Sequence, residues 1–253
     1  MARGPRIRSE SGIYHVMLRG LDKRDIFLDD EDRIRFIEGM TKAKEKSEFI
    51  LYGYCIMDNH IHILLKEAED IGTIIKRITV GYIGWHNRKY ERTGHLFQNR
   101  FRSEPVETEG YLLTVMRYIH QNPVKAGITK RPIEYKWSSY TDYEKIYRNV
   151  ETIVDGELAR SYFPTYKSFE EYMNTKNEDE VLEYKITVNQ NDENLLNLIK
   201  EKYEIYDLDA LSKTDRNKLI LGIYSSENTS IRQLSRVFGV GKTVVEKAIK
   251  KDR

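Results

Sequence analysis

The sequence contains a single cysteine, Cys55, among its 253 residues. One cysteine cannot form an internal disulfide, so a disulfide-stapled secreted domain is excluded and a protein of the reducing cytoplasm is predicted. Long apolar stretches are also missing, since no run approaches the roughly 20 residues that span a bilayer. Residues 1–8 are basic but precede no apolar segment, which predicts neither a secretory signal nor a membrane partner.

The net charge is small as well, at +2, but the charges are unevenly distributed along the chain. Residues 1–148 carry 26 Lys and Arg against 21 Asp and Glu, and residues 210–253 carry 10 against 4. Between them, residues 149–209 carry 6 against 15. Two basic segments that flank an acidic one predict two anion-binding units joined by a connector that does not bind anions.

Hydrophobic periodicity predicts the elements of the first segment, which we assign to one domain, residues 1–148. Strands and helices alternate in the order β-α-β-β-α-β-α, with strands expected at 12–20, 49–57, 61–66 and 103–107 and helices at 30–47, 71–92 and 109–122. This order is typical of a mainly antiparallel sheet with helices on one face. The predicted fold class is therefore α+β, ferredoxin-like or RRM-like, with the second face of the sheet open.

The rest of the chain is predicted to be all-α. Residues 149–208 are interpreted as an acidic helical connector and residues 209–253 as a helix-turn-helix DNA-binding domain. Its helices are expected at 211–224, 230–239 and 242–251, with Gly239 in the position that commonly ends a helix. A short helix, a glycine turn and a basic helix are the outline of a helix-turn-helix.

The last of these helices carries four polar residues that are predicted to face outward, toward duplex DNA: Lys242, Thr243, Lys247 and Lys250. The alternative is a generic helical hairpin whose basic face is solvated.

A pair of histidines, His60 and His62, follows the turn at Asp58 and Asn59. Side chains on a strand alternate between faces, so both imidazoles are expected on one face, about 6.5 Å apart along the strand. Two imidazoles on a rigid element suit a divalent metal if a third ligand comes from elsewhere. The alternative is a pair of half-exposed polar residues on the solvent face of a sheet.

The helix expected at 109–122 offers the missing groups, because Tyr118 and Asn122 are four residues apart and share a face. An amide oxygen is an acceptable ligand for Mg or Mn, and a phenol can act as a nucleophile. Alternatively, Tyr118 is a core aromatic residue. His120 is expected to face elsewhere and to bond locally. Pro123 disfavours helical dihedrals at Asn122.

Three motifs resemble those of the single-tyrosine transposases of the HUH endonuclease superfamily. They are MDNHIHIL at 57–64, GHLFQNRF at 94–101 and RYIHQNPVKAG at 117–127. The resemblance covers roughly residues 5–145 and is greatest to the REP-associated tyrosine transposases, which have an IS200-like transposase domain.

This resemblance implies a five-stranded antiparallel sheet and a divalent metal, Mg or Mn, bound by His60, His62 and Asn122. Many relatives outside the REP-associated branch carry Gln in the place of Asn122. Tyr118 matches the nucleophile, which cuts single-stranded DNA beside a hairpin and forms a 5′-phosphotyrosine. The metal would polarise the scissile phosphate. Relatives act as monomers or homodimers.

Four arginines are candidates for phosphate contacts: Arg6, Arg8, Arg100 and Arg102. Each could equally be an ordinary solvated side chain. Two other functions remain open for the whole chain. One is a catalytically silent DNA-binding regulator that uses the C-terminal helices, and the other is an RRM-like RNA binder.

Overall fold

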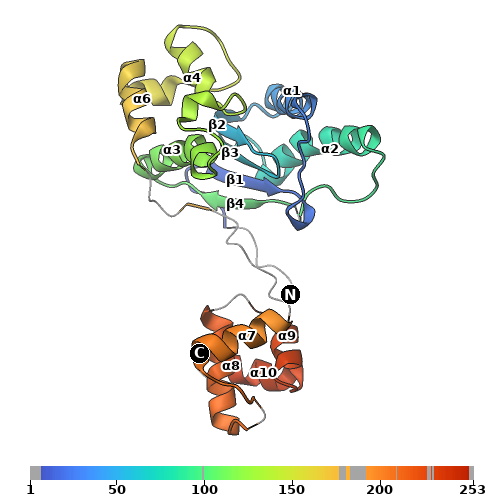
Figure 1. Cartoon of the computed structure of the whole chain (residues 1–253). Helices are drawn as coiled ribbons and strands as arrows, with labels where there is room; N and C mark the ends of the chain where they lie inside the picture. The colour runs from blue at the N-terminus through green and yellow to red at the C-terminus, as the bar shows by residue number, and fades with distance from the viewer. Residues whose placement is uncertain are drawn as a thin grey trace. The chain divides into compact units, whose positions relative to one another are not determined.

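The computed structural model describes residues 7–98, 100–176, 181–182, 192–208, 210–226, 229 and 231–250. The chain divides into two compact units, Met1–Glu183 and Tyr184–Arg253 (Figure 1). This division differs from the three segments predicted from charge. The acidic segment is shared between the units, because its first two helices lie in the first unit and its last helix in the second.

The first unit is built on a four-stranded antiparallel sheet. Its strands are β1 (Ile13–Arg19), β2 (Ile50–Ile56), β3 (His60–Lys66) and β4 (Arg102–Pro105), in the order β2-β3-β1-β4. The predicted α+β class is confirmed. The resemblance implied five strands, whereas the described residues form four.

The sheet register assigns the side chains of β3 to two faces. His62 lies opposite Met17 of β1 and Cys55 of β2, so these three side chains share a face with His60. Ile61 and the other odd-numbered residues of β3 point to the opposite face and are fully buried. The alternation read from the sequence is thus the one that the sheet adopts.

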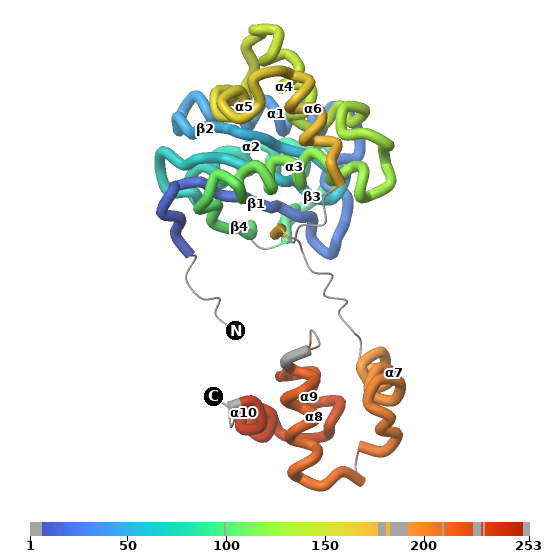
Figure 2. The backbone as a smooth tube through the Cα atoms, turned by 90° about the vertical axis from the view of Figure 1, so that its left-hand side faces the viewer, coloured from blue at the N-terminus to red at the C-terminus, as the bar shows by residue number. Residues whose placement is uncertain are grey.

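Helices α1 (Asp30–Ser47) and α2 (Ile71–Lys89) pack together on the face that carries Ile61 (Figure 2). Each begins where an aspartate caps it: Asp29 accepts from the backbone N–H of Asp32, and Asp70 from that of Thr73. Their buried apolar side chains complete the main core with this side of the sheet.

The other face was predicted to be open, and this prediction is wrong. Helix α3 (Glu109–Lys125), capped by Thr108, lies across it (Figures 1 and 2). The helix carries an apolar stripe that includes Val115, Met116 and Ile119, all fully buried. Burial of this apolar stripe against the strands is favourable, so α3 covers this face of the sheet. His62 is buried beneath the helix as a result.

Helix α3 also continues past Pro123, where the sequence predicted its end. Pro123 has no N–H to donate, but the next turn closes, because the N–H of Ala126 donates to the carbonyl of Asn122 over 3.0 Å. Asn122 therefore stays helical, one turn beyond Tyr118 and on the same side of α3.

The edge strand β2 is covered by the chain that follows α3. The N–H of Ile56 donates to the carbonyl of Trp137, and the N–H of Ser139 donates to the carbonyl of Tyr54. Helices α4 (Tyr140–Tyr147), α5 (Glu157–Tyr162) and α6 (Tyr166–Asn174) complete the unit around Phe169. Two 3-10 turns, Leu21–Lys23 and Pro132–Glu134, lie in loops.

The second unit contains α7 (Asp192–Tyr203), α8 (Lys213–Ser226), α9 (Ile231–Val237) and α10 (Lys242–Lys250). Buried apolar side chains from all four helices form its core, among them Leu195, Ile220, Leu234 and Val245. The predicted glycine stop of α9 is confirmed: Gly239 has φ +59°, its N–H donates to Arg236, and that of Val240 donates to Ser235. No helix in the described ranges of either unit is long and apolar enough to cross a membrane.

Candidate active site

The histidine pair of β3 faces α3. His62 is fully buried, His60 is half-buried, and their ring centroids are 5.1 Å apart at nearly a right angle. Strand alternation fixes both imidazoles on this face, as the sequence predicted, but His62 has no exposed surface and His60 is only partly exposed.

Asn122 brings the carboxamide of α3 against both imidazoles. Its Oδ1 lies 3.3 Å from Nε2 of His60, and its Nδ2 lies 3.2 Å from Nε2 of His62. Residues from β3 and α3 that are 60 and 62 positions apart in the sequence therefore meet at one point. This is the set that sequence reasoning selected.

Tyr118 lies one turn before Asn122 and packs against the same histidines. Its ring centroid is 5.5 Å from that of His62, edge to face, and only 2% of its surface is exposed. The ammonium of Lys125 lies 4.5 Å from the centroid of the Tyr118 ring. A cation there favours negative charge on the phenol, so Lys125 is a functional candidate that the sequence analysis missed.

His120 points away from this cluster, as predicted. Its Nε2 lies 2.8 Å from Oγ of Ser139, beside β2, and complete burial lowers its pKa to about 3. His120 is therefore a neutral core residue that fixes α3 against the strand edge.

The donor set around His60 fits a divalent cation. Nδ1 of His60 lies 2.7 Å from Oδ1 of Asn59, whose own Nδ2 donates to the carbonyl of Lys23 over 3.3 Å. This orientation places the His60 proton on Nδ1 and leaves a lone pair on Nε2. Nε2 of His60 and Oδ1 of Asn122 are then both hydrogen-bond acceptors, and they face each other without a proton between them. A cation bound by both atoms would accept both lone pairs.

The electrostatics of His62 also fit a metal ligand. Burial, together with the neighbouring His15 and His60, lowers the pKa of His62 well below its usual value. His62 is therefore neutral, the form in which imidazole binds metals. No cluster of three His, Cys, Asp or Glu side chains occurs in the part of the chain that the structure describes, and the polar side chain that lies against both imidazoles is the amide of Asn122.

Two further residues, His15 on β1 and Glu104 on β4, lie behind His62 and were not selected from the sequence. Nε2 of His15 is 2.8 Å from Nδ1 of His62, and Nδ1 of His15 is 3.8 Å from Oε2 of Glu104. Strand alternation could have placed His15 on the correct face. It could not give the register that makes Glu104 the cross-strand partner of His15.

Comparison with known protein families shows what this part of the chain is similar to. Residues 9–122, which contain both histidines, Tyr118 and Asn122, match the family model described as "Transposase IS200 like". Over these residues the chain is similar to the IS200-like transposases, and we refer to residues 9–122 as the IS200-like domain. The resemblance read from the three motifs is thereby confirmed.

A solved structure described as "Structure of the REP associates tyrosine transposase bound to a REP hairpin" shares the fold of the IS200-like domain. The TM-score is 0.50 at 17% sequence identity, and the match covers 60% of this chain and 90% of that one. No match was found among the sequences of characterised proteins.

The described arginines that are predicted to contact DNA occupy different parts of the first unit. Arg8 is exposed in the segment before β1, and Arg102 begins β4 on the same face as the histidines. Arg100 lines a cavity of about 630 Å³ between α2 and residues 94–101. Arg6 lies outside the described residues.

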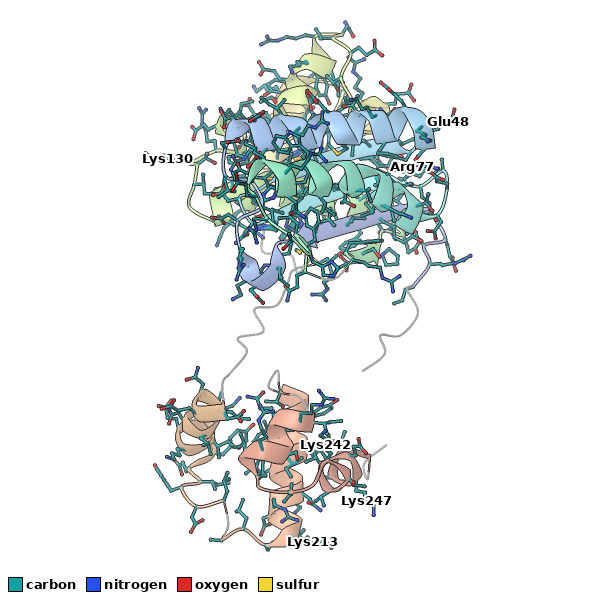
Figure 3. The ribbon with its side chains drawn as sticks, turned by 90° about the vertical axis from the view of Figure 1, so that its right-hand side faces the viewer. Glu48, Arg77, Lys130, Lys213, Lys242 and Lys247 are labelled. Atoms are coloured by element: carbon teal, nitrogen blue, oxygen red, sulfur yellow. The ribbon has the colours of Figure 1, made fainter. Side chains whose placement is uncertain are left out.

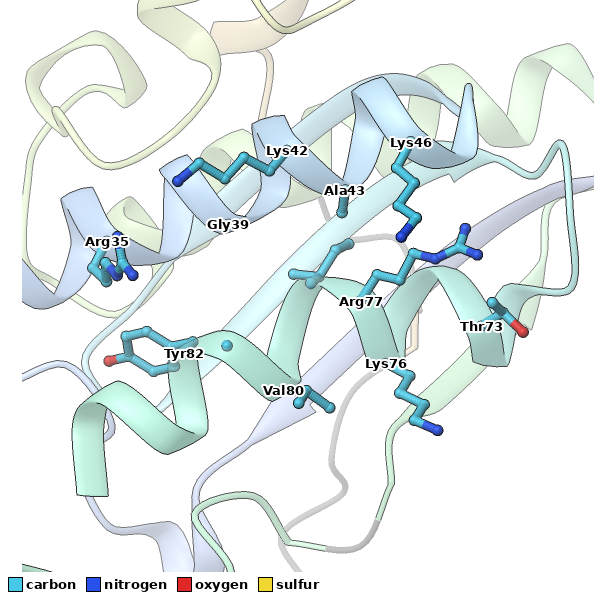
Figure 4. A pocket seen from close by; sticks show the side chains of 12 residues that line it. Arg35, Gly39, Lys42, Ala43, Lys46, Thr73, Lys76, Arg77, Val80 and Tyr82 are labelled. Carbon is cyan, nitrogen blue, oxygen red and sulfur yellow. The ribbon is translucent and has the colours of Figure 1, made fainter. Parts of the chain in front are cut away.

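A second hollow of the IS200-like domain, about 580 Å³, lies between α1 and α2 (Figure 4). Lysine and arginine side chains line it, among them Lys42, Lys46 and Arg77. Both helices cover the face of the sheet opposite the histidines, so this hollow is not part of the candidate active site.

In the second unit, Lys242, Thr243 and Lys247 are exposed on α10, as predicted (Figure 3). Lys250 belongs to the same helix, but its side chain lies outside the described residues. The structure confirms three consecutive helices here, and their role as a DNA-binding helix-turn-helix stays a prediction.

Proposed function

We propose that the protein is a metal-dependent single-stranded DNA endonuclease and strand transferase, a transposase whose nucleophile is Tyr118. The observation that supports this most strongly is the meeting of His60, His62 and Asn122 beside the ring of Tyr118, inside a domain of the transposase family. A pure binding module has no need of a phenol packed against a potential metal site.

In the proposed reaction, Tyr118 Oη attacks the phosphorus of a phosphodiester in line with the bond to the 3′-oxygen. The phenol loses its proton, the P–O3′ bond breaks, and the leaving strand takes up a proton to end in a 3′-OH. Mg²⁺ or Mn²⁺, held by His60, His62 and Asn122, supplies Lewis-acid polarisation of the phosphate when bound.

The product is a 5′-phosphotyrosine that keeps the energy of the phosphodiester bond. A 3′-OH from another strand can therefore attack it and join the ends without ATP. Lys125 lies where its charge favours the phenolate of Tyr118, because its ammonium is close to the ring.

We propose single-stranded DNA beside a hairpin as the substrate. The solved relative with the same fold is described as bound to a REP hairpin. Arg8, Arg100 and Arg102 are the described arginines that we assign to phosphate contacts, and Arg6 is proposed with them from the sequence.

The test is a hairpin oligonucleotide labelled separately at its two ends and incubated with the full chain and Mn²⁺. The label on the 3′ side of the cut should stay covalently attached to the protein, and the other fragment should be released with a free 3′-OH. Tyr118→Phe should abolish the adduct while DNA binding remains. Tyr140→Phe, which removes another buried hydroxyl, should keep it. An adduct in Tyr118→Phe would refute the assignment.

We further propose that α8, α9 and α10 form a helix-turn-helix that binds duplex DNA. The exposed pair Lys242 and Lys247 on α10 supports this assignment (Figure 3). Removing both lysines should flatten the dependence of log K on log salt by about 2, one for each lost phosphate contact. Lys200→Ala, on α7 of the same unit and outside the proposed helix-turn-helix, is the matched control and should leave the slope unchanged.

The Lys242→Ala and Lys247→Ala variant, compared with His60→Ala, separates the enzyme from a catalytically silent regulator. A regulator would lose its function in the Lys242→Ala and Lys247→Ala variant and keep it in His60→Ala. The proposed enzyme loses adduct formation in His60→Ala.

A further inference from the structure

The candidate active site extends behind His62, to side chains that touch neither Asn122 nor Tyr118 through a hydrogen bond. His15 is fully buried in the centre of the sheet, with Glu104 as its cross-strand neighbour on β4. The rings of His15 and His62 lie nearly parallel, with centroids 5.1 Å apart. Glu104, His15 and His62 thus form a continuous row that leads from a carboxylate to the amide of Asn122.

The carboxylate at the start of this row is held in place. Its Oε2 accepts the backbone N–H of Leu182 over 3.1 Å. Partial burial raises the pKa of Glu104, but contacts with His15 and Tyr111 outweigh this and hold the pKa below its usual value. The row therefore begins with a negative charge at neutral pH.

Only one proton can lie between Nε2 of His15 and Nδ1 of His62. The nitrogen that carries this proton determines whether His62 can bind a metal through Nε2. If His15 Nε2 carries it, His62 Nδ1 accepts, and neutral His62 must then carry its own proton on Nε2, where it cannot bind a metal. His15 Nδ1 would also turn a lone pair toward the carboxylate of Glu104. If His62 Nδ1 carries the proton, Nε2 keeps its lone pair.

The charge of Glu104 selects the second arrangement. Nδ1 of His15 lies 3.8 Å from Oε2 of Glu104 and has no partner at hydrogen-bond distance among the described residues. An N–H there points at a negative charge, whereas a lone pair would be repelled. With Nδ1 of His15 protonated, its Nε2 is an acceptor, and His62 Nδ1 donates to it.

We propose that His15 and Glu104 are positioning residues of the candidate active site: Glu104 orients His15, and His15 holds the proton of His62 on Nδ1, so that the lone pair of Nε2 faces the divalent cation. The proposal rests on the proposed function, because it assigns the metal to the same face of His62. Partners behind a metal-binding histidine generally fix its tautomer and orientation in this way.

The first test needs no metal and no DNA. In the full chain labelled with 15N histidine, two-bond 15N–1H correlations distinguish an Nδ1–H from an Nε2–H tautomer. The signals of His62 are assigned by their loss in His62→Asn. Wild-type His62 should be the Nδ1–H tautomer, and His15→Phe or Glu104→Gln should shift it toward Nε2–H. An Nε2–H tautomer in the wild type overturns the proposal.

The second test measures the Kd for Mn²⁺ by calorimetry in the absence of DNA. His15→Phe and Glu104→Gln should each raise the Kd by about 10–100-fold, the usual effect of losing such a partner. His15→Gln should restore most of the affinity, because its amide oxygen can accept from His62 Nδ1. Glu107→Gln removes a nearby carboxylate that bonds the segment before β1, and it should bind Mn²⁺ like the wild type.

The outcomes separate this proposal from the proposed function. If His15→Phe and Glu104→Gln bind Mn²⁺ as tightly as the wild type, the positioning role alone is overturned. If both variants bind Mn²⁺ more weakly than the wild type but the wild type forms no phosphotyrosine, the proposed reaction alone is overturned. If His15→Phe does not fold, Glu104→Gln still decides, because its side chain is about one-third exposed and keeps its shape.

Discussion

The buried His120 predicts how the stability of the first unit depends on pH. Burial lowers its pKa to about 3, against 6.5 for an ordinary histidine. Between pH 6.5 and about pH 3 the unfolded chain therefore binds a proton on His120 and the folded chain does not. The free energy of unfolding falls as the pH is lowered through this range. At pH 5, which is 1.5 units below the ordinary pKa of 6.5, protonation of His120 stabilises the unfolded state by about 2 kcal/mol, at ~1.4 kcal/mol per pH unit.

Urea unfolding of the wild type and of His120→Gln at pH 7.5 and pH 5.0 measures this contribution. Because Gln does not titrate, the loss of unfolding free energy between the two pH values should be about 2 kcal/mol smaller in the variant. His15 and His62 add a loss of the same sign in both proteins, since burial lowers their pKa values too. His95→Gln removes an exposed histidine and should keep the wild-type loss. An equal loss in wild type and His120→Gln would refute the reasoning.

Three other predictions follow from the site and the packing. Mn²⁺ at 100 times the wild-type Kd should stabilise the wild type by about 2.7 kcal/mol, and Asn122→Ala should lose most of this in thermal unfolding. Lys125→Met should slow adduct formation by Tyr118 roughly fivefold, because it removes a cation 4.5 Å from the ring centroid, an interaction worth about 1 kcal/mol, and Lys125→Arg should not. Gly156→Ala places Cβ 2.3 Å from Cγ2 of Ile146 and should cost about 1–3 kcal/mol in urea unfolding, a cost that disappears when Ile146 is already Ala.

Local patterns were sufficient to predict most elements of the first unit and their order. The alternation in β3 placed His60 and His62 on one face, and helical spacing put Tyr118 and Asn122 on one side of α3. The glycine stop at Gly239 was also readable, because a left-handed helix end favours that residue. These features depend on a few neighbouring residues, which the sequence shows directly.

The errors concern contacts between distant segments. The apolar stripe of α3 was visible, but nothing local indicates which face of the sheet it covers, so the histidine face was predicted to be open. Pro123 was expected to end α3, and the local preference was overridden by the bonds of the following turn. The pairing of His15 with Glu104 depends on strand register, which one sequence does not specify.

The division of the acidic segment was also not readable from its charge. Helices α5 and α6 join the first unit through the aromatic cluster around Phe169, whereas Leu195 and Ile199 of α7 join the core of the second. The net charge of a segment does not show which of its apolar side chains become buried. Those buried contacts determine in which unit a helix packs.

The central claim is that Tyr118 becomes covalently linked to DNA when a divalent metal is present. Trypsin releases residues 118–125, YIHQNPVK, as a peptide in which Tyr118 is the only tyrosine. Mass spectrometry of the protein after reaction with a hairpin oligonucleotide and Mn²⁺, followed by nuclease and trypsin, should find a nucleotide phosphate on this peptide. It should be absent when a chelator replaces Mn²⁺. A nucleotide on any other peptide, or none in the presence of Mn²⁺, would contradict the account.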